Sequence, residues 1–472
     1  MKSWKWGLYA LLATWALMTW YSGGKIERIY TEQLSKISGR EYTFITVGKG
    51  KFERGFFTSN AETIVQLRPD PCKPPVEIVV REKIRNDPLL GGGVIKSNIT
   101  LDFQDDALSS ALKKASPDLP PLTLTGIYHL SGRREYQGQS PAMVITDSDG
   151  SKLDWKGMTL TAVLDRDDES FDFQSGGIHL TSGDMDMAFD TIHVNSSIRP
   201  TAIGLDVGES EFSLGSVSLN STHLGIVGNM SAGGLGFKTS LALNAGKAES
   251  ESSVRFADLK IGKDKLSFAA TFALNHIDTE AMKKLVAAGR ESRKACHPDV
   301  GELATRFGAI FDGTAELTLK QLEFKYADKT LHMDGVVKGL SLPVNSSDIG
   351  MQMLADGSLL HDVDMQFKVT MNEAMLVDAP GANSPRMLAR LREKVLANGI
   401  FTQAGDSFIT DVTYRDDQLR LNGTPWSQLF PSGSGASLFS GLSSGVGEAS
   451  ALEEGVGADE VSPADASTPF DR

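Results

Sequence analysis

Residues 122–277 alternate between apolar and polar side chains over almost their whole length, and no other feature of the sequence constrains the fold as strongly. Gly, Ser, Asp and Asn separate the alternating runs, as expected for turns between strands. A period of two places every second side chain on the same face, so each run predicts a β-strand with one buried and one solvated face. We therefore predict a mainly β chain with a few helices, built as a long curved antiparallel sheet or a sandwich.

The alternation slips by one residue in a motif that occurs three times. Two apolar residues stand two apart, a gap of two residues follows, and a second apolar pair comes after it. The three copies are Phe212, Leu214, Val217 and Leu219; Val254, Phe256, Leu259 and Ile261; and Leu317, Leu319, Leu322 and Phe324. A slip of one residue would turn the second pair to the other face, whereas a β-bulge would return it to the first. The motif predicts bulges and a curved sheet whose apolar face is either closed as a core or open as a groove.

Composition and spacing divide the chain into parts. These are an N-terminal apolar segment at 1–24, an α+β part at 25–120, the β-rich body at 121–430 and an acidic tail at 431–472. Apolar residues at helical spacing predict helices at 26–37, 105–115, 279–310 and 385–398. The tail has no periodicity and only one basic residue, Arg472, so we predict that it is disordered.

The N-terminal segment has the features of a membrane anchor. It carries no charged residue between Trp6 and Gly24, and at ~1.5 Å per residue it is just long enough to cross a hydrocarbon core of ~30 Å. Amphipathic rings stand at both ends as expected membrane-interface anchors, namely Trp4, Trp6, Trp20 and Tyr21. We predict a single-pass transmembrane signal-anchor with the body outside the cytoplasm; a cleaved signal peptide is the alternative.

The chain contains two cysteines, Cys72 and Cys296, far apart in the sequence. Neither belongs to a Cys-x-x-Cys pair or to the spacing of a metal site. In an oxidising compartment they can form one disulfide that closes a long loop, and the alternative is two unpaired thiols.

Two short segments resemble the signatures of a known family. Residues 52–59 read Phe-Glu-Arg-Gly-Phe-Phe-Thr-Ser, and residues 418–425 read Gln-Leu-Arg-Leu-Asn-Gly-Thr-Pro. They are similar to the aromatic-x-Arg-Gly-aromatic-x-Ser-Ser and hydrophobic-Asn-Gly-x-Pro signatures of the YdgA-like bacterial proteins, domain of unknown function 945. The matching residues are Arg54, Gly55, Phe56, Ser59, Asn422, Gly423 and Pro425. Where that family has a His-Gly-Pro step, this chain has Asn86, Asp87 and Pro88.

The resemblance implies a Gram-negative envelope protein that is anchored in the bacterial inner membrane and has a β-rich periplasmic body. It implies no catalytic residues. The residues themselves predict a structural role for the first motif. Gly55 is expected to supply a bulge or a positive φ, and Phe56 and Phe57 are expected to pack on opposite faces of a strand end.

Motifs that carry chemistry are absent from the sequence. There is no Gly-x-Ser-x-Gly elbow, and no Walker or dinucleotide-binding glycine loop stands at a strand–helix junction. His179 and His193 are the best-placed pair for a metal across a hairpin, but strand histidines are usually surface or packing residues. The acidic residues at 165–169, and the pair Asp184 and Asp186, are more typical of solvated turns than of calcium sites. We predict no catalytic residues, no metal and no cofactor.

Together these features favour a non-enzymatic, membrane-anchored periplasmic protein that acts as a scaffold or binding module. The expected partners are the inner membrane and envelope proteins or lipid, and the formal net charge of −13 argues against nucleic acid. One alternative is binding or transfer of a lipid or other hydrophobic ligand along an apolar groove of the sheet. It would be lined by residues such as Phe212, Leu214, Phe256 and Phe324. Another is an envelope hydrolase, whose titratable side chains would converge in a cleft.

Overall fold

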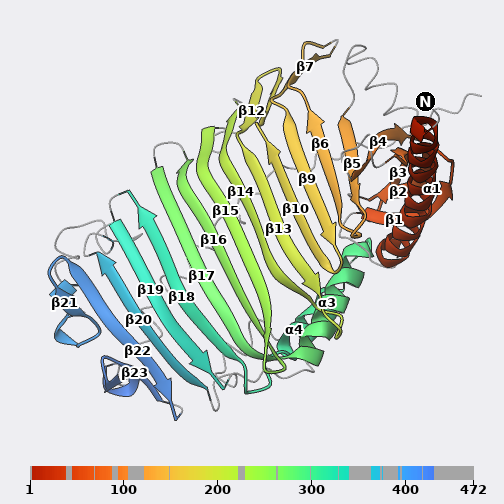
Figure 1. The fold of residues 1–472 in the computed structure, drawn as a ribbon. Helices are drawn as coiled ribbons and strands as arrows, with labels where there is room; N and C mark the ends of the chain where they lie inside the picture. Colours follow the sequence, from red (N-terminus) through yellow and green to blue (C-terminus); the bar gives the residue numbers. More distant parts are fainter. Residues whose placement is uncertain are drawn as a thin grey trace, which may run out of the picture.

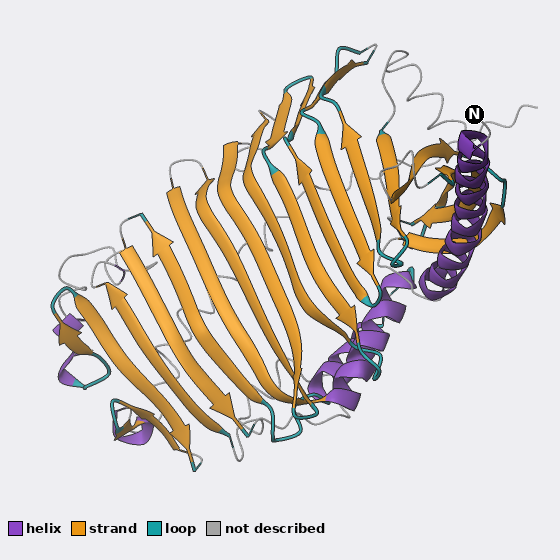
Figure 2. Cartoon of the chain, viewed as in Figure 1, coloured by secondary structure: helices purple, strands orange, loops and turns teal. Residues whose placement is uncertain are grey.

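The computed structural model describes most of the chain as one antiparallel sheet with a few helices. The described residues are 3–38, 45–68, 70–87, 94–104, 122–147, 149–221, 229–261, 264–297, 299–327, 329–339, 363–372, 375, 392–393, 396–416 and 418–429. Within these residues, 24 strands belong to a single sheet. Figures 1 and 2 show it as one broad curved layer. The prediction of a mainly β fold with few helices is confirmed.

Short turns join many of the consecutive strands, whereas α3 and α4 lie between β17 and β18. Their bounds are β1 Ile45–Glu53, β2 Thr58–Leu67, β3 Val76–Arg85, β4 Val94–Phe103, β5 Thr123–His129, β6 Arg134–Ser140, β7 Met143–Thr146, β8 Lys152–Trp155, β9 Met158–Asp165, β10 Asp168–Ser175, β11 Ile178–Ser182, β12 Met185–Phe189, β13 Ile192–Pro200, β14 Asp206–Ser221, β15 Asn229–Asn244, β16 Lys247–Ile261, β17 Asp264–Asp278, β18 Glu316–Tyr326, β19 Lys329–Lys338, β20 Asp364–Asn372, β21 Thr402–Ala404, β22 Ser407–Arg415, β23 Gln418–Leu421 and β24 Thr424–Pro425. The described helices are α1 Ser3–Ser38, α3 Thr279–Lys294, α4 Val300–Gly308 and α8 Trp426–Leu429.

Pairing runs in one direction across the layer. Its order is β1–β2–β3–β4–β5–β6–β9–β10–β13–β14–β15–β16–β17–β18–β19–β20–β22–β23–β24, and every pair is antiparallel. A second set, β7–β8–β11–β12, continues the layer and joins it at the second half of β14. Short turns suit this arrangement; between β15 and β16, Ala245 and Gly246 both have positive φ, as a tight hairpin requires.

The predicted bulges are present on two of the three motif strands. On β16 the register shifts between Phe256 and Leu259, and on β18 it shifts between Leu319 and Leu322. Each shift falls in the two-residue gap between the apolar pairs, so the extra residue keeps both pairs on one face. On β14 the gap coincides with the point where the strand leaves β13 and begins to pair with β12.

The helices differ from the sequence-based expectation at the N-terminus. A spanning segment and a separate helix at 26–37 were expected, but α1 is one continuous helix through Gly23 and Gly24. Its Ile26, Ile29 and Tyr30 pack into a buried cluster with Ala61, Ile84, Ile95 and Tyr128 of the first strands. In the described part of the chain, no helix has the length and apolar character needed to cross a membrane.

The predicted helical region at 279–310 is present as α3 and α4, each capped by an aspartate. Asp278 accepts from the backbone N–H groups of Glu280 and Ala281, and Asp299 accepts from that of Glu302. The predicted helix at 105–115 and the tail at 431–472 lie outside the described residues. The same holds for most of the predicted helix at 385–398.

A disulfide joins two parts of the sheet that are distant in sequence. Cys72, in the turn between β2 and β3, is bonded to Cys296, which follows α3, with the Cα atoms 4.6 Å apart. The helix α3 packs on β16 and β17 near Ala248 and Ile277, and its Arg290 forms an ion pair with Asp206 at the start of β14. The bond therefore ties the first strands to a helix that rests on the middle of the sheet.

Replacing both cysteines, Cys72→Ala with Cys296→Ala, is expected to lower the free energy of unfolding by about 2–4 kcal/mol. The bond spans 224 residues, and a crosslink over a long loop restricts the unfolded chain. Urea unfolding followed by tryptophan fluorescence measures the difference. A reducing agent should lower the midpoint of the wild type and leave the double variant unchanged. Equal midpoints of the two proteins under oxidising conditions would contradict the prediction.

Candidate functional site

The register of the sheet aligns apolar side chains into continuous rows on one face. Residues directly opposite one another in an antiparallel pair point to the same face, so a chain of such partners defines a row. The first apolar row comprises Leu124, Gly138, Leu160, Phe173, Val194, Phe212, Phe237, Val254, Ala270, Leu322, Met333 and Val369. The second comprises Met158, Ser175, Ile192, Leu214, Leu235, Phe256, Phe268, Phe324, Leu331, Met371 and Phe408. Neither row contains a charged residue. We call the face that bears these rows the apolar face.

The opposite face is polar along the same strands. One row on it comprises Thr125, Gln137, Thr161, Asp172, Asn195, Glu211, Lys238, Ser253, Thr271 and Gln321. Ion pairs such as Lys238 with Glu209, at 3.0 Å, lie on this side. The sheet is therefore amphipathic across its breadth, with a solvated polar face and an apolar face that needs a cover.

Helices cover the apolar face at two places. The first apolar row continues through Ile99, Glu82, Ala61 and Phe52, and α1 packs on that continuation. The helix α3 packs against Leu241 and Leu274, which lie on the same face toward the ends of their strands. Both buried apolar clusters found among the described residues lie beneath one of these helices.

Away from the parts that α1 and α3 cover, large apolar side chains of this face reach solvent. Phe237 is 46% exposed, and Phe171, Phe256 and Phe272 are each more than one-third exposed. Aromatic side chains on the inner face of a packed sheet are normally buried, so these four mark a surface without a core. An exposed apolar surface of this breadth is typical of a binding site.

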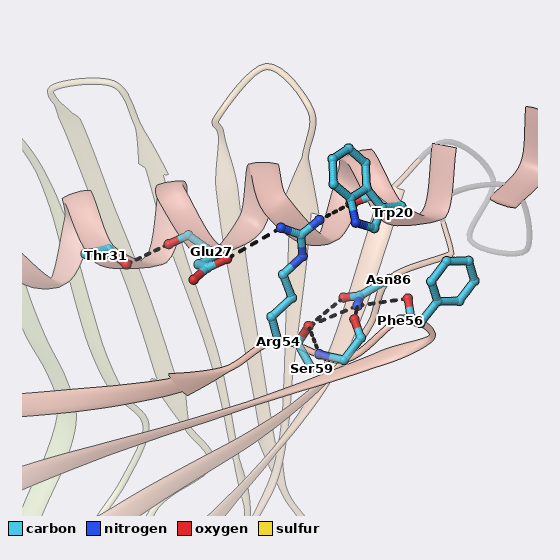
Figure 3. Close-up of polar contacts among 8 residues, drawn as sticks. Trp20, Glu27, Thr31, Arg54, Phe56, Ser59 and Asn86 are labelled. Atoms are coloured by element: carbon cyan, nitrogen blue, oxygen red, sulfur yellow. Dashed lines mark hydrogen bonds and ion pairs between the residues drawn. The ribbon is translucent and has the colours of Figure 1, made fainter. Parts of the chain in front are cut away.

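The motif at 52–59 builds the joint between α1 and the sheet (Figure 3). The buried Asn86 is its centre: the side-chain amide donates to the carbonyls of Gly55 (2.7 Å) and Phe56 (3.2 Å), and its Oδ1 accepts from Ser59 (3.1 Å). The carbonyl of Asn86 accepts from the hydroxyl of Ser22 on α1, at 2.8 Å. Asn86 thus links the motif to the helix.

Arg54 attaches to the helix beside this centre. Its Nη2 donates to the carbonyl of Trp20 at 2.6 Å, its guanidinium lies 4.9 Å from the centroid of the Trp20 ring, and Glu27 is 3.8 Å away. The paired glycines of α1 make room for these contacts: a Cβ on Gly23 would lie 3.1 Å from the Asn86 side chain, and one on Gly24 would lie 3.0 Å from that of Arg54. The glycines therefore serve close approach, and the helix continues through them.

Two expectations for this motif need correction. Gly55 has no positive φ; it is required because a Cβ there would lie 2.0 Å from the carbonyl oxygen of Thr58. Phe56 and Phe57 do not pack on opposite faces of a strand. Both are exposed in the turn between β1 and β2, edge to face with ring centroids 4.7 Å apart, and Phe57 also contacts Trp15. Both residues belong to the turn and not to a strand, so they have no alternating strand faces on which to pack.

The second motif closes the far edge of the sheet. Asn422 and Gly423 both have positive φ and form the turn between β23 and β24. The Asn422 amide donates to the carbonyls of Gly399 and Ile400, and its Oδ1 accepts from the backbone N–H of Asp411. Pro425 lies opposite Arg420 in the final pair. These contacts give the motif a structural role at that edge.

The structure describes the side chains of two of the four expected membrane-interface aromatics, Trp20 and Tyr21. Trp20 and Tyr21 on α1 are 58% and 60% exposed. They line a shallow pocket with a volume of about 590 Å³ between that helix and Arg54. The side chains of Trp4 and Trp6 lie outside the described part of the structure. Trp15, within the charge-free segment, donates its indole N–H to Asp87 at 3.1 Å.

The weak metal candidates are separate from one another. His179 faces Asp186 at 3.0 Å on β12, whereas His193 faces Asp172 at 2.9 Å on β10. The hydrogen bond from His193 lowers the pKa of Asp172. The acidic stretch 165–169 forms a hairpin tip in which Asp168 pairs with Arg199. Among the described residues, no three His, Cys, Asp or Glu side chains gather as a metal site would require.

A buried carboxylate on the apolar face was not expected from the sequence. Glu82 is buried on β3, and its Oε1 accepts from Ser97 and from the Tyr128 hydroxyl, the latter at 2.7 Å. Burial raises the pKa of Glu82 above its ordinary value. Glu82 alternates in phase with Val80 and Ile84, which is the signal that could have marked it as inward-facing.

Comparison with known proteins gives a family but no relative of known structure. A family model described as a bacterial protein of unknown function, DUF945, matches residues 6–428. No curated protein and no solved structure matches the chain.

Replacing the centre of the joint, Asn86→Ala, is expected to loosen α1 from the sheet. It leaves the carbonyls of Gly55 and Phe56 without their side-chain donor, and such a loss costs about 1–3 kcal/mol. Hydrogen exchange of the backbone amides at 19–30 should become faster, which mass spectrometry of peptides measures. The matched control is Asn98→Ala, an exposed position on β4, which should leave exchange unchanged. Equal exchange in both variants would show that Asn86 does not hold the helix.

Proposed function

The chain belongs to the DUF945 family of bacterial proteins of unknown function, and we propose that it binds long-chain lipid along the apolar face of its sheet while α1 holds it at the bacterial inner membrane. The observation that carries the proposal is the exposure of Phe171, Phe237, Phe256 and Phe272 on the apolar face. The proposal is for a binding protein and includes no catalytic step.

The dimensions of the uncovered face suit hydrocarbon chains. From β6 to β20 the first apolar row crosses the layer in pairing order, and at ~4.8 Å per strand this is about 50 Å. Burial of apolar surface contributes roughly 25 cal/mol per Å². A long chain laid along the two rows would therefore remove a substantial apolar area from water on both partners.

The chemistry of the rows favours lipid over a protein partner. A protein–protein interface carries about one hydrogen bond per 100–200 Å². In the two rows, only Ser175 bears a hydrogen-bonding side chain. Two rows with so few donors and acceptors match an acyl chain, which needs none. Hydroxyl groups on this face stand in the adjacent row that joins Phe171 to Phe272, at Ser196, Ser210, Thr239 and Ser252.

Two features support the envelope location in this proposal. The charge-free segment of α1, whose second half docks on the sheet through Trp15 and Ser22, carries aromatic residues at both ends, as a membrane anchor does. Disulfides such as Cys72–Cys296 persist in oxidising compartments, among them the bacterial periplasm. The apolar rows begin beside α1, so a lipid leaving the membrane would reach them along the helix.

The wild-type protein, extracted in mild detergent, is expected to carry bound lipid in native mass spectra. The double variant Phe237→Glu with Phe256→Glu should reduce the bound fraction about tenfold or more, because a lipid would then have to bury two carboxylates. The matched control is Ser253→Glu, which lies on the same strand as Phe256 but on the polar face of the sheet, and this variant should retain lipid. Thermal unfolding verifies that all three fold.

Two results would overturn the proposal. One is a wild-type protein without lipid, and the other is equal loss of lipid in the apolar-face and polar-face variants. Co-purification of a stoichiometric envelope protein that is lost only in the double variant would instead assign the apolar face to a scaffold.

A further inference from the structure

One charged side chain on the apolar face lacks a full set of partners. Arg134 begins β6 and is 3% exposed. Its Nη1 donates to the Tyr136 hydroxyl at 3.1 Å, and its guanidinium lies 5.9 Å from the ring centroids of both Tyr128 and Tyr136. Its Nε and Nη2 atoms are buried and have no hydrogen-bond partner among the described residues.

The two unpartnered atoms are the side-on fork of the guanidinium. The Nε–H and one Nη2–H point the same way, and this pair matches the two oxygens of a carboxylate or phosphate. Arginine stays protonated at any ordinary pH, so burial cannot neutralise it. A buried cation without an anion is strongly unfavourable, and the fork therefore marks a place for an anionic ligand.

The nearest buried acid does not fill this role. Glu82 directs Oε1 to Ser97 and Tyr128, and no ion pair joins it to Arg134 among the described residues. Burial raises the pKa of Glu82, and the nearby charge of Arg134 acts in the opposite direction. The cluster therefore has a cation whose buried fork has no hydrogen-bond acceptor among the described residues and a carboxyl group whose Oε1 is bonded elsewhere.

The position of Arg134 relates the fork to the apolar rows. Arg134 lies opposite Tyr128, which packs beneath α1, and opposite Leu164 of β9 on the other side. On β6 itself, Gly138 of the first apolar row is four residues further along, on the same face, so at ~3.3 Å per residue the two are about 13 Å apart. Arg134 thus stands at the border between the part of the face that α1 covers and the part that is open.

We propose that Arg134 is the headgroup site of this face: its fork binds the carboxylate or phosphate of an anionic lipid whose hydrocarbon chain lies on the two apolar rows. The inference rests on the proposed lipid binding and names the class of lipid. A neutral lipid would leave the fork empty, whereas an anionic one would add two charge-assisted hydrogen bonds.

The test compares two ligands that differ only in the headgroup. Full-length protein in nonionic detergent at pH 8 is titrated with palmitate and with hexadecanol, each displacing a fluorescent fatty acid. Palmitate is expected to bind about tenfold more tightly than hexadecanol, since hydrogen bonds to a charged group are the stronger kind. Inorganic phosphate is added in a separate arm to distinguish a lipid headgroup from a free anion.

Variants assign the preference to the fork. Arg134→Met keeps the volume and removes the charge, so the preference for palmitate should disappear while hexadecanol binding is retained. Arg134→Lys keeps the charge but not the fork and should lose most of the preference. The matched control Arg133→Met removes the same charge at the exposed neighbouring position, where the residue pairs with Glu135, and should keep the preference. Removal of a poorly paired buried charge is not expected to lower the melting temperature.

Each outcome separates this inference from the proposed function. If neither ligand binds the wild type, lipid binding itself is wrong. If both bind equally, or if Arg134→Met keeps the preference, lipid binding stands and the headgroup site is wrong. If phosphate alone displaces the probe from the wild type but not from Arg134→Met, the fork binds free anions and the lipid assignment is overturned. The wild-type comparison decides the question even if a variant fails to fold.

Discussion

The register between neighbouring strands is the constraint on which the rest of the structure depends. A shift of one residue anywhere between β6 and β20 would move every later side chain to the opposite face. The bulges at Phe256/Leu259 on β16 and at Leu319/Leu322 on β18 prevent this, because each absorbs the residue by which the apolar pattern slips. The continuity of the apolar rows across the layer is therefore a consequence of local irregularities in single strands.

A single layer with one apolar face cannot be complete without a second layer. Among the described residues, α1 and α3 provide that layer at two places, around Ile84 and around Ile277. The disulfide between Cys72 and Cys296 links the turn between β2 and β3, near the first place, to the residue that follows α3 at the second.

The sequence predicts what depends on neighbouring residues and misses what depends on distant ones. The bulges of β16 and β18 were predictable because the slipped pattern is written within eight residues. The pairing of Cys72 with Cys296 could be posed only as one of two alternatives, since it depends on how the whole sheet curves. Gly23 and Gly24 accommodate Asn86 and Arg54, which come from distant turns, so their role could not be predicted from the helix sequence alone. Arg134 and Glu82 were not singled out at all, because their burial follows from the packing of α1 over strands far from it in the sequence.

The continuity of α1 connects the proposed membrane anchor to the proposed lipid-binding face. Ser22 and Tyr30 dock α1 on the sheet, and the charge-free segment, which includes Ser22, belongs to the same continuous helix. At ~1.5 Å per residue, Trp20 is only about 9 Å along the axis from Ile26, so a membrane interface at the level of Trp20 and Tyr21 would lie close to the joint formed by Arg54 and Asn86. The border of the open face, where Arg134 stands, is one strand beyond the part that α1 covers. A headgroup site there would receive an anionic lipid near the membrane surface, with the apolar rows leading its chain away from the bilayer.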